Sequence, residues 1–180
     1  MHHVVELHFD DATELKLAEL TRTIRSARLD ISETICGIRP HITLGSCEPL
    51  KLDSLGPKLA ELFSHFHPIE VRFSSVGLFS KTNGNFVAYL GPTASLTLCQ
   101  WHLDLFRLLD AEGVKSFDFT RPEAAVFHCT LSNDLPQARL SEAIEIAGSY
   151  IPLSGRIIRG AVVEYFPARE RIGFDFKGDA

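Results

Sequence analysis

The pattern His-x-Thr-Leu occurs twice in the chain, at residues 41–44 and at residues 128–131. In a β-strand, successive side chains point to opposite faces, so residues i and i+2 share a face. We therefore expect each copy to place an imidazole and a hydroxyl side by side, while Ile42 and Cys129 face the other way. Two such strands facing each other would line a cleft with two proton carriers and two neutral hydrogen-bond donors.

These residue types suit acid–base chemistry on a phosphodiester. Hydrolysis of a 2′,3′-cyclic phosphate needs a base for water, an acid for the departing ribose oxygen, and donors to the phosphate oxygens. Histidine titrates near neutral pH, so one imidazole can be neutral while the other is protonated. We predict His41 and His128 as the catalytic pair, and Thr43 and Thr130 as substrate-binding donors. The residues themselves do not separate the acid from the base, and the scheme requires no metal.

Two less specific interpretations stay open. In one, both copies are ordinary core strands, each with a hydrogen-bonded histidine. In the other, the protein keeps the cleft as a binding module that holds a nucleotide or RNA end without turnover. The repetition of the pattern in matching context favours a functional site over core strands. Incubation with 2′,3′-cyclic nucleotides would separate an enzyme from a binding module.

The paired motifs, with the contexts Arg39-Pro40-His41 and Phe127-His128-Cys129, resemble the 2H phosphoesterase superfamily. That superfamily includes the bacterial 2′-5′ RNA ligase-like proteins and the cyclic nucleotide phosphodiesterases. The resemblance implies a bilobal, duplicated α+β fold, with two antiparallel sheets flanking a central cleft and helices outside. It also implies that His128 is the base and His41 the acid.

One departure from the superfamily bears on the substrate. Many RNA ligase-like relatives carry an arginine shortly after the second motif, whereas here no basic residue follows before Arg139. Asp134 would place negative charge near the cleft instead. We therefore expect hydrolysis of a small cyclic phosphate more than true RNA ligation.

Composition limits the class of protein and its partners. The 180 residues are 45% apolar and 23% charged, which is ordinary for one globular domain, here residues 1–180 with approximate halves 1–83 and 84–180. The net charge of −5 provides no overall field for long duplex DNA. We expect the partner to be a nucleotide or a short RNA end with a cyclic phosphate, and the protein to be a monomer.

Cysteine spacing and hydropathy give the remaining expectations. The four cysteines, at positions 36, 47, 99 and 129, show no C-x-x-C spacing that would indicate zinc or a thioredoxin-like site. We expect no metal and no cofactor. There is no secretory pattern and no apolar run long enough to span a membrane, so we expect a cytoplasmic protein with free thiols.

Hydrophobic periodicity predicts strands and helices in an order that repeats in the two halves. The order is strand, helix, motif strand, helix, strand, and corresponding elements are about 85 residues apart. An old duplication with a pseudo-twofold axis would bring His41 and His128 together. The predicted strands cover residues 4–9, 41–45, 69–79, 86–90, 126–131, 153–166 and 172–176. The predicted helices cover residues 12–29, from a cap at Asp53 to Pro68, 93–111 and around 140–147.

Several other residues are weaker candidates. His65 and His67 have strand-like ligand spacing but precede Pro68, so a solvated helix end is the simpler interpretation. His8 alternates with Glu6 and could border the cleft. The following residues could reach a phosphate or stack a base, although core packing is the simpler role for the aromatic ones: Arg39, Lys81, Arg121, Phe79, Phe86 and Tyr89.

Overall fold

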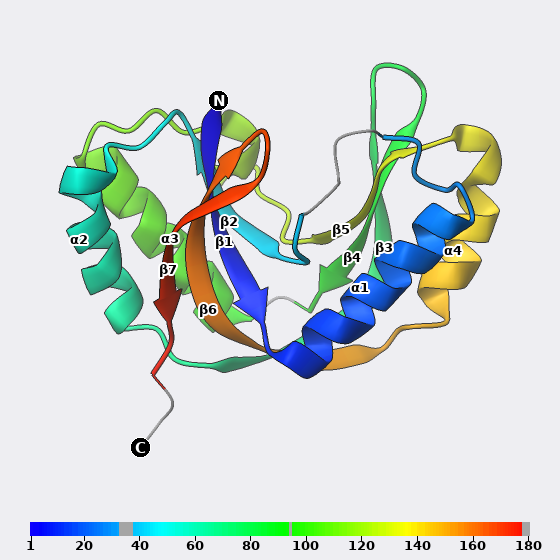
Figure 1. Ribbon diagram of the computed structural model, residues 1–180, viewed down its shortest axis with the longest axis horizontal. Coiled ribbons are helices and arrows are strands. Elements are labelled where there is room, and N and C mark those ends of the chain that lie inside the picture. Colours follow the sequence, from blue (N-terminus) through cyan, green and yellow to red (C-terminus); the bar gives the residue numbers. More distant parts are fainter. Residues whose placement is uncertain (33–37, 94, 178–180) are drawn as a thin grey trace.

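The computed structural model describes residues 1–32, 38–93 and 95–177, in which each predicted helix and strand is present (Figure 1). The strands are β1 (His2–Phe9), β2 (Ile42–Cys47), β3 (Ile69–Ser80), β4 (Phe86–Pro92), β5 (Cys129–Leu135), β6 (Leu153–Tyr165) and β7 (Arg169–Asp175). The helices are α1 (Asp11–Ser26), α2 (Leu52–Ser64), α3 (Leu96–Ala111) and α4 (Leu140–Gly148), with short 3₁₀ turns η1 (Asp118–Thr120) and η2 (Gln137–Arg139).

The seven strands form one antiparallel sheet, and the prediction of two separate sheets is therefore wrong. The strand order is β2-β1-β6-β3-β4-β5, and β7 pairs with β6. The long strand β6 joins the halves, because residues 153–157 pair with β3 while residues 157–165 pair with β1. The hydrophobic pattern predicts both ends of β6 as strand, but it does not show that they have different partners.

The order of elements repeats between the halves as predicted. The first half runs β1-α1-β2-α2-β3, and the second runs β4-α3-β5-α4-β6. The sheet order is symmetric under this exchange, which maps β1 to β4, β2 to β5 and β3 to β6. The two motif strands are thus the two end strands of the sheet.

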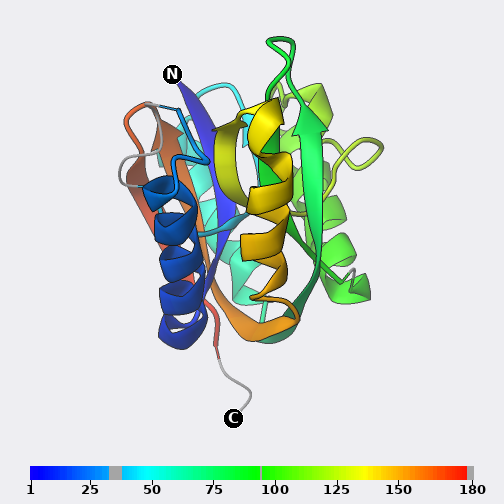
Figure 2. The ribbon, with the colours of Figure 1, turned by 90° about the vertical axis from the view of Figure 1, so that its right-hand side faces the viewer.

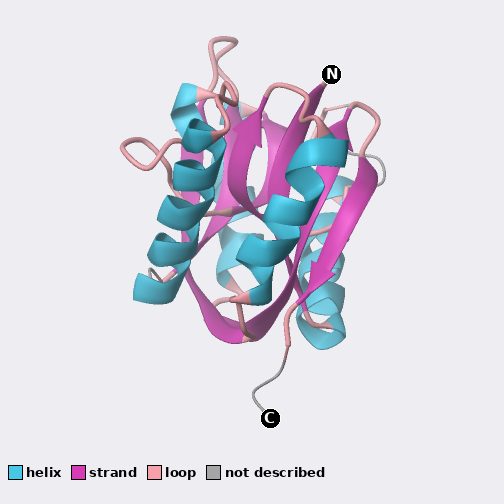
Figure 3. Ribbon diagram, turned by 90° about the vertical axis from the view of Figure 1, so that its left-hand side faces the viewer, coloured by secondary structure: helices cyan, strands magenta, loops and turns pink. Residues whose placement is uncertain are grey.

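The helices lie outside the sheet in two groups. Helix α1 packs beside α4 and against β5, and Figure 2 shows α1 and α4 side by side. On the other side of the molecule, α3 packs against β2 and α2 against β7 (Figure 3). Each motif strand is therefore covered by a helix from the other half of the sequence.

Local sequence explains where the helices begin. The Asp10 side chain caps α1 by accepting a hydrogen bond of 2.8 Å from the Thr13 amide, and Ser95 caps α3 in the same way. Helix α2 has no side-chain cap, so the predicted cap at Asp53 is wrong; this residue lies inside the first turn. Its carboxylate still lies near the positive end of the helix dipole.

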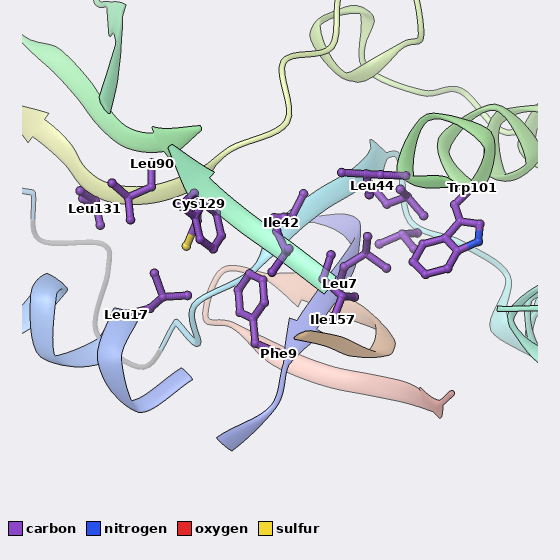
Figure 4. Close-up of a cluster of buried hydrophobic side chains, with 14 of the residues drawn as sticks. Leu7, Phe9, Leu17, Ile42, Leu44, Leu90, Trp101, Cys129, Leu131 and Ile157 are labelled. Carbon is purple, nitrogen blue, oxygen red and sulfur yellow. The ribbon is translucent and has the colours of Figure 1, made fainter. Parts of the chain in front are cut away.

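The core runs beneath the two motif strands. Ile42 and Leu44 of β2 are fully buried, and Cys129 and Leu131 of β5 are nearly so. Figure 4 shows these side chains in one apolar layer that also contains Leu90. Because alternate residues enter this layer, the threonines between them remain on the other face, as the pleat of the strands predicts.

Candidate active site

The two motif histidines stand immediately before the strands rather than within them. His41 precedes β2 and His128 precedes β5, and these end strands come together where the sheet curves (Figure 1). Burial raises the pKa of the Cys129 thiol to about 12, and the neighbouring His41 backbone opposes that shift. The starts of the two motif strands, which are 87 positions apart in sequence, are therefore neighbours in the fold.

Both imidazoles are held in the same way by the backbone. The Nδ1 atom of His41 lies 2.8 Å from the carbonyl oxygen of Arg39, and Nδ1 of His128 lies 2.6 Å from that of Val126. In both cases the carbonyl belongs to the residue two positions earlier. A carbonyl only accepts hydrogen bonds, so each Nδ1 carries the proton. Each Nε2 atom is then the one left for proton transfer.

A cavity of about 400 Å³ opens above the motif strands, and His41, Thr43 and Thr130 are among the residues that line it. The structure therefore brings three of the four predicted residues to one cavity. His128 does not line the cavity itself. It lies close enough to His41 for the positive charge of that imidazole to influence its pKa.

One part of the cavity lining is polar and basic. Helix α1 contributes Thr21, Arg22 and Arg25, and β5 contributes Asn133. Among the residues that the structure describes, neither of these arginines forms an ion pair. Arg39 also lines the cavity, but its Nε atom donates a 2.7 Å hydrogen bond to Glu14. The cavity therefore presents cationic groups close to the motif residues, which suits a phosphorylated ligand.

The surroundings of His128 are apolar and aromatic. Its ring lies 5.0 Å from the ring of Phe79 and 5.2 Å from that of Tyr89, centre to centre. Burial lowers the pKa of His128, the hydrogen bond to Val126 opposes this effect, and a charged His41 lowers the pKa further. The His128 imidazole is therefore mostly neutral at pH 7.

The surroundings of His41 contain a buried carboxylate instead. Oε1 of Glu6 lies 3.7 Å from Nε2 of His41 and accepts a 2.6 Å hydrogen bond from the Tyr165 hydroxyl. Its other oxygen lies 3.0 Å from Nε2 of His8. Burial alone would raise the pKa of Glu6, but His41, His8 and Tyr165 together lower it. Burial and the Glu6 charge raise the pKa of Tyr165, which keeps its proton in this bond.

The strand register shows which residue lies beside each motif threonine in the two halves of the chain. Glu6 of β1 pairs with Thr43 of β2, and Tyr89 of β4 pairs with Thr130 of β5. The strand position that carries a carboxylate beside the first motif thus carries a phenol ring beside the second. The two histidines are alike in orientation and different in electrostatic environment.

Comparison with known proteins assigns the family. Residues 12–165 match the model of the 2'-5' RNA ligase superfamily, which covers both motifs. The chain belongs to this superfamily. No curated protein matches the chain significantly.

Solved structures share the fold of this superfamily member. The TT0787 protein of Thermus thermophilus superposes with a TM-score of 0.63 at 16% identity, over 100% of both chains. LigT of E. coli superposes with a TM-score of 0.62 at 13% identity, over 98% of this chain and 94% of LigT. A LigT structure with 3'-AMP gives a TM-score of 0.59 at 14% identity, over 98% and 95%. At such identities these matches show a shared α+β fold.

Asp134, whose negative charge was expected near the cleft, is paired with a lysine in this structure. Nζ of Lys81 lies 2.6 Å from its carboxylate, and Asn83 and Asn85 also donate hydrogen bonds to it. These contacts lower the pKa of Asp134. It does not line the cavity, whereas its neighbour Asn133 does. Asp134 therefore contributes no negative charge to the part of the cavity lining that the structure describes.

The three basic residues that were predicted to reach a phosphate lie in different surroundings. Arg39 reaches the cavity, but Lys81 is paired with Asp134, and Arg121 is paired with Asp110. Arg22 and Arg25 were not among the predicted residues, although they occur on α1 at helical spacing. The pattern shows that they share a face with Ala18, but not that this face meets β5.

The other candidate residues lie away from the cavity. His8 is buried rather than at the cleft border, and His65 is exposed beside Glu61. Within residues 1–32, 38–93 and 95–177, no group of three His, Cys, Asp or Glu side chains could hold a metal. Cys47, Cys99 and Cys129 are free, and Cys36 lies outside the described residues. No described helix is long and apolar enough to cross a membrane.

Proposed function

We propose that the chain is a phosphodiesterase that hydrolyses a 2′,3′-cyclic phosphate or a 2′-5′ linkage at a nucleotide or RNA end. Membership of the 2'-5' RNA ligase superfamily supports the reaction class. The observation that carries the proposal is the paired orientation of His41 and His128. Each imidazole is fixed through Nδ1 by a carbonyl two residues earlier, and the threonine two residues later in each motif lines the cavity.

The electrostatic difference between the histidines supports distinct roles. His128, with its lowered pKa and aromatic neighbours, is the base. His41, with the buried carboxylate of Glu6 3.7 Å from its Nε2 atom, is the acid. A general base must be unprotonated at the working pH, which the lowered pKa of His128 favours, and a nearby carboxylate complements the cationic form that a general acid needs.

The reaction then needs no covalent intermediate. His128 Nε2 takes a proton from water as the water oxygen attacks phosphorus. The bond from phosphorus to one ribose oxygen breaks, and the His41 imidazolium gives that oxygen its proton. Thr43 and Thr130 donate hydrogen bonds to the non-bridging phosphate oxygens, where negative charge accumulates. After this step His128 is protonated and His41 is neutral. Proton transfer through solvent then restores the starting form of both.

Nucleotide binding by a structural relative supports the same ligand class. Crystal structures of E. coli LigT are described with 3'-AMP, with NADP+ and with ATP. The cationic part of the cavity in this chain, formed by Arg22 and Arg25, is suited to such phosphorylated ligands. We also propose that residues 1–180 form one unit that arose by duplication of halves 1–83 and 84–180, because the sheet order is symmetric under their exchange.

The proposed function is tested by incubating the protein with nucleoside 2′,3′-cyclic monophosphates in the presence of EDTA. We expect conversion to the nucleoside monophosphate at an undiminished rate, because the two histidines carry the proton transfers. Product separation identifies which ribose oxygen has been released. Tight binding of the substrate without turnover would favour the binding-module alternative, and a rate lost to EDTA and restored by added zinc or magnesium would contradict the mechanism.

The charge of Glu6 should set the alkaline side of the pH–rate profile. In the wild type, the acid limb of kcat/KM should lie below pH 6.5, because the pKa of His128 is lowered from that value. Glu6→Gln removes the negative charge that lies 3.7 Å from His41 Nε2, and with it the carboxylate partner of the proposed general acid. The alkaline limb of kcat/KM should therefore move to lower pH, with the acid limb nearly unchanged.

Tyr165→Phe is the matched control for this variant. It removes the hydrogen bond to Glu6 and keeps both the carboxylate charge and the ring. If loss of packing or hydrogen bonding caused the effect, both variants would shift the profile alike. An unchanged alkaline limb in Glu6→Gln would show that Glu6 does not hold the charge on His41.

A further inference from the structure

Five aromatic rings extend from the cavity to the protein surface. His2, Tyr165 and Phe166 line the cavity. The ring of His2 stacks on Tyr165 at 5.6 Å and lies 5.7 Å from Phe117, whose ring stacks on Phe119 at 5.9 Å. Phe166 lies 5.1 Å from Tyr165 and 6.1 Å from His2. We call these five residues the aromatic platform.

The outer members of the platform are unusually exposed. Phe119 is 69% exposed and Phe166 is 56% exposed. Single exposed apolar residues are common on protein surfaces, but an exposed cluster continuous with a cavity indicates a binding surface. The exposed faces of these rings are thus open to a ligand that already occupies the cavity.

The backbone attaches the platform to the first motif strand. The Phe117 amide donates a 2.8 Å hydrogen bond to the carbonyl of Ser46 in β2. The Ser46 amide in turn donates a 3.1 Å bond to the Thr120 hydroxyl. Ser46 lies three residues beyond Thr43, which is about 10 Å along a strand. The outer end of the platform is therefore held on the scaffold that positions the proposed phosphate site, and it lies beyond that site.

Charge in the cavity distinguishes between possible occupants. An exposed aromatic surface alone would also suit an apolar peptide. Here the same cavity presents Arg22 and Arg25 from α1, together with the hydroxyl and imidazole groups of the motifs. Aromatic faces that stack bases, next to cations that bind phosphates, are the combination used to bind single-stranded nucleic acid.

We propose that the aromatic platform binds successive bases of a single-stranded RNA whose terminal cyclic phosphate lies at the motif residues. The terminal base stacks against the rings in the cavity, and the preceding base reaches Phe119. The inference rests on the proposed function and narrows its substrate class. The preferred substrate is an oligonucleotide end, and a mononucleotide is the smallest part that still reacts.

The test compares a nucleoside 2′,3′-cyclic phosphate with an RNA trinucleotide that ends in the same group. For the wild type, KM should be lower for the trinucleotide. Phe119→Ala should raise the ratio of the trinucleotide KM to the mononucleotide KM by about fivefold to 140-fold, the typical effect of losing one base–aromatic stack. Phe166→Ala should raise both KM values, because Phe166 lines the cavity.

Leu96→Ala is the matched control, since Leu96 is 87% exposed on α3 and does not line the cavity. It should leave both KM values unchanged. Fluorescence anisotropy with a labelled trinucleotide ending in a 3′-phosphate measures binding without turnover. If the wild type hydrolysed neither substrate but Phe119→Ala bound the RNA more weakly than the wild type, the result would support the platform and reject the proposed function. Wild-type KM values and RNA affinity in Phe119→Ala, with normal hydrolysis, would overturn the platform alone.

Discussion

His41→Ala and His128→Ala should each lower kcat for 2′,3′-cyclic phosphate hydrolysis by about 10²–10⁴-fold, the usual contribution of a positioned acid or base. Each variant leaves one partner intact but removes the proton donor or the proton acceptor of the same step. The hydrogen bond that fixes each side chain runs from Nδ1 to a backbone carbonyl and is not one of the strand-pairing bonds, so removal of the side chain leaves the sheet pairing in place. Steady-state kinetics and a thermal melt of each variant give the measurement.

The double variant tests whether the two histidines act as one unit. Its rate should be close to that of the slower single variant, because acid and base act in the same transition state. His65→Ala is the matched control, since His65 is largely exposed and contacts only Glu61 among described charged groups. A single variant that keeps more than about a tenth of the wild-type rate would contradict the acid–base assignment.

Thr43→Val and Thr130→Val should each lower kcat by about 10²–10³-fold, which corresponds to roughly 2.7–4 kcal/mol of transition-state stabilisation. Valine keeps the β-branched shape and loses the hydroxyl donor. Both threonines line the cavity while their strand neighbours Ile42 and Cys129 are buried, so the substitutions leave the core unchanged. The rate should fall with little change in the position of the pH optimum, which the histidines determine.

Serine at these positions should restore much of the rate, because it returns the donor. Thr82→Val is the matched control, since Thr82 lies exposed in the turn between β3 and β4. It should behave as wild type. Valine variants with the wild-type rate would mean that the hydroxyls do not contact the phosphate in the transition state.

The elements and the motif geometry could be predicted from local sequence. Local propensity and hydrophobic period act over a few residues, so the positions of α1 and β6 follow from the sequence with errors of only a few residues. The strict alternation of a strand likewise predicted that Ile42 and Cys129 face away from Thr43 and Thr130, and in the structure the first two are buried while the threonines are not. The repeated order of elements indicated two similar halves.

How these elements join depends on pairing between distant segments. The two ends of β6 pair with strands from different halves, which turns two expected sheets into one. Glu6 comes beside His41, and Tyr89 and Phe79 come beside His128, through pairing between distant strands. Two copies of one local motif therefore acquire different surroundings, because long-range contacts, which leave no periodic signal in the sequence, set the electrostatic environment of each imidazole.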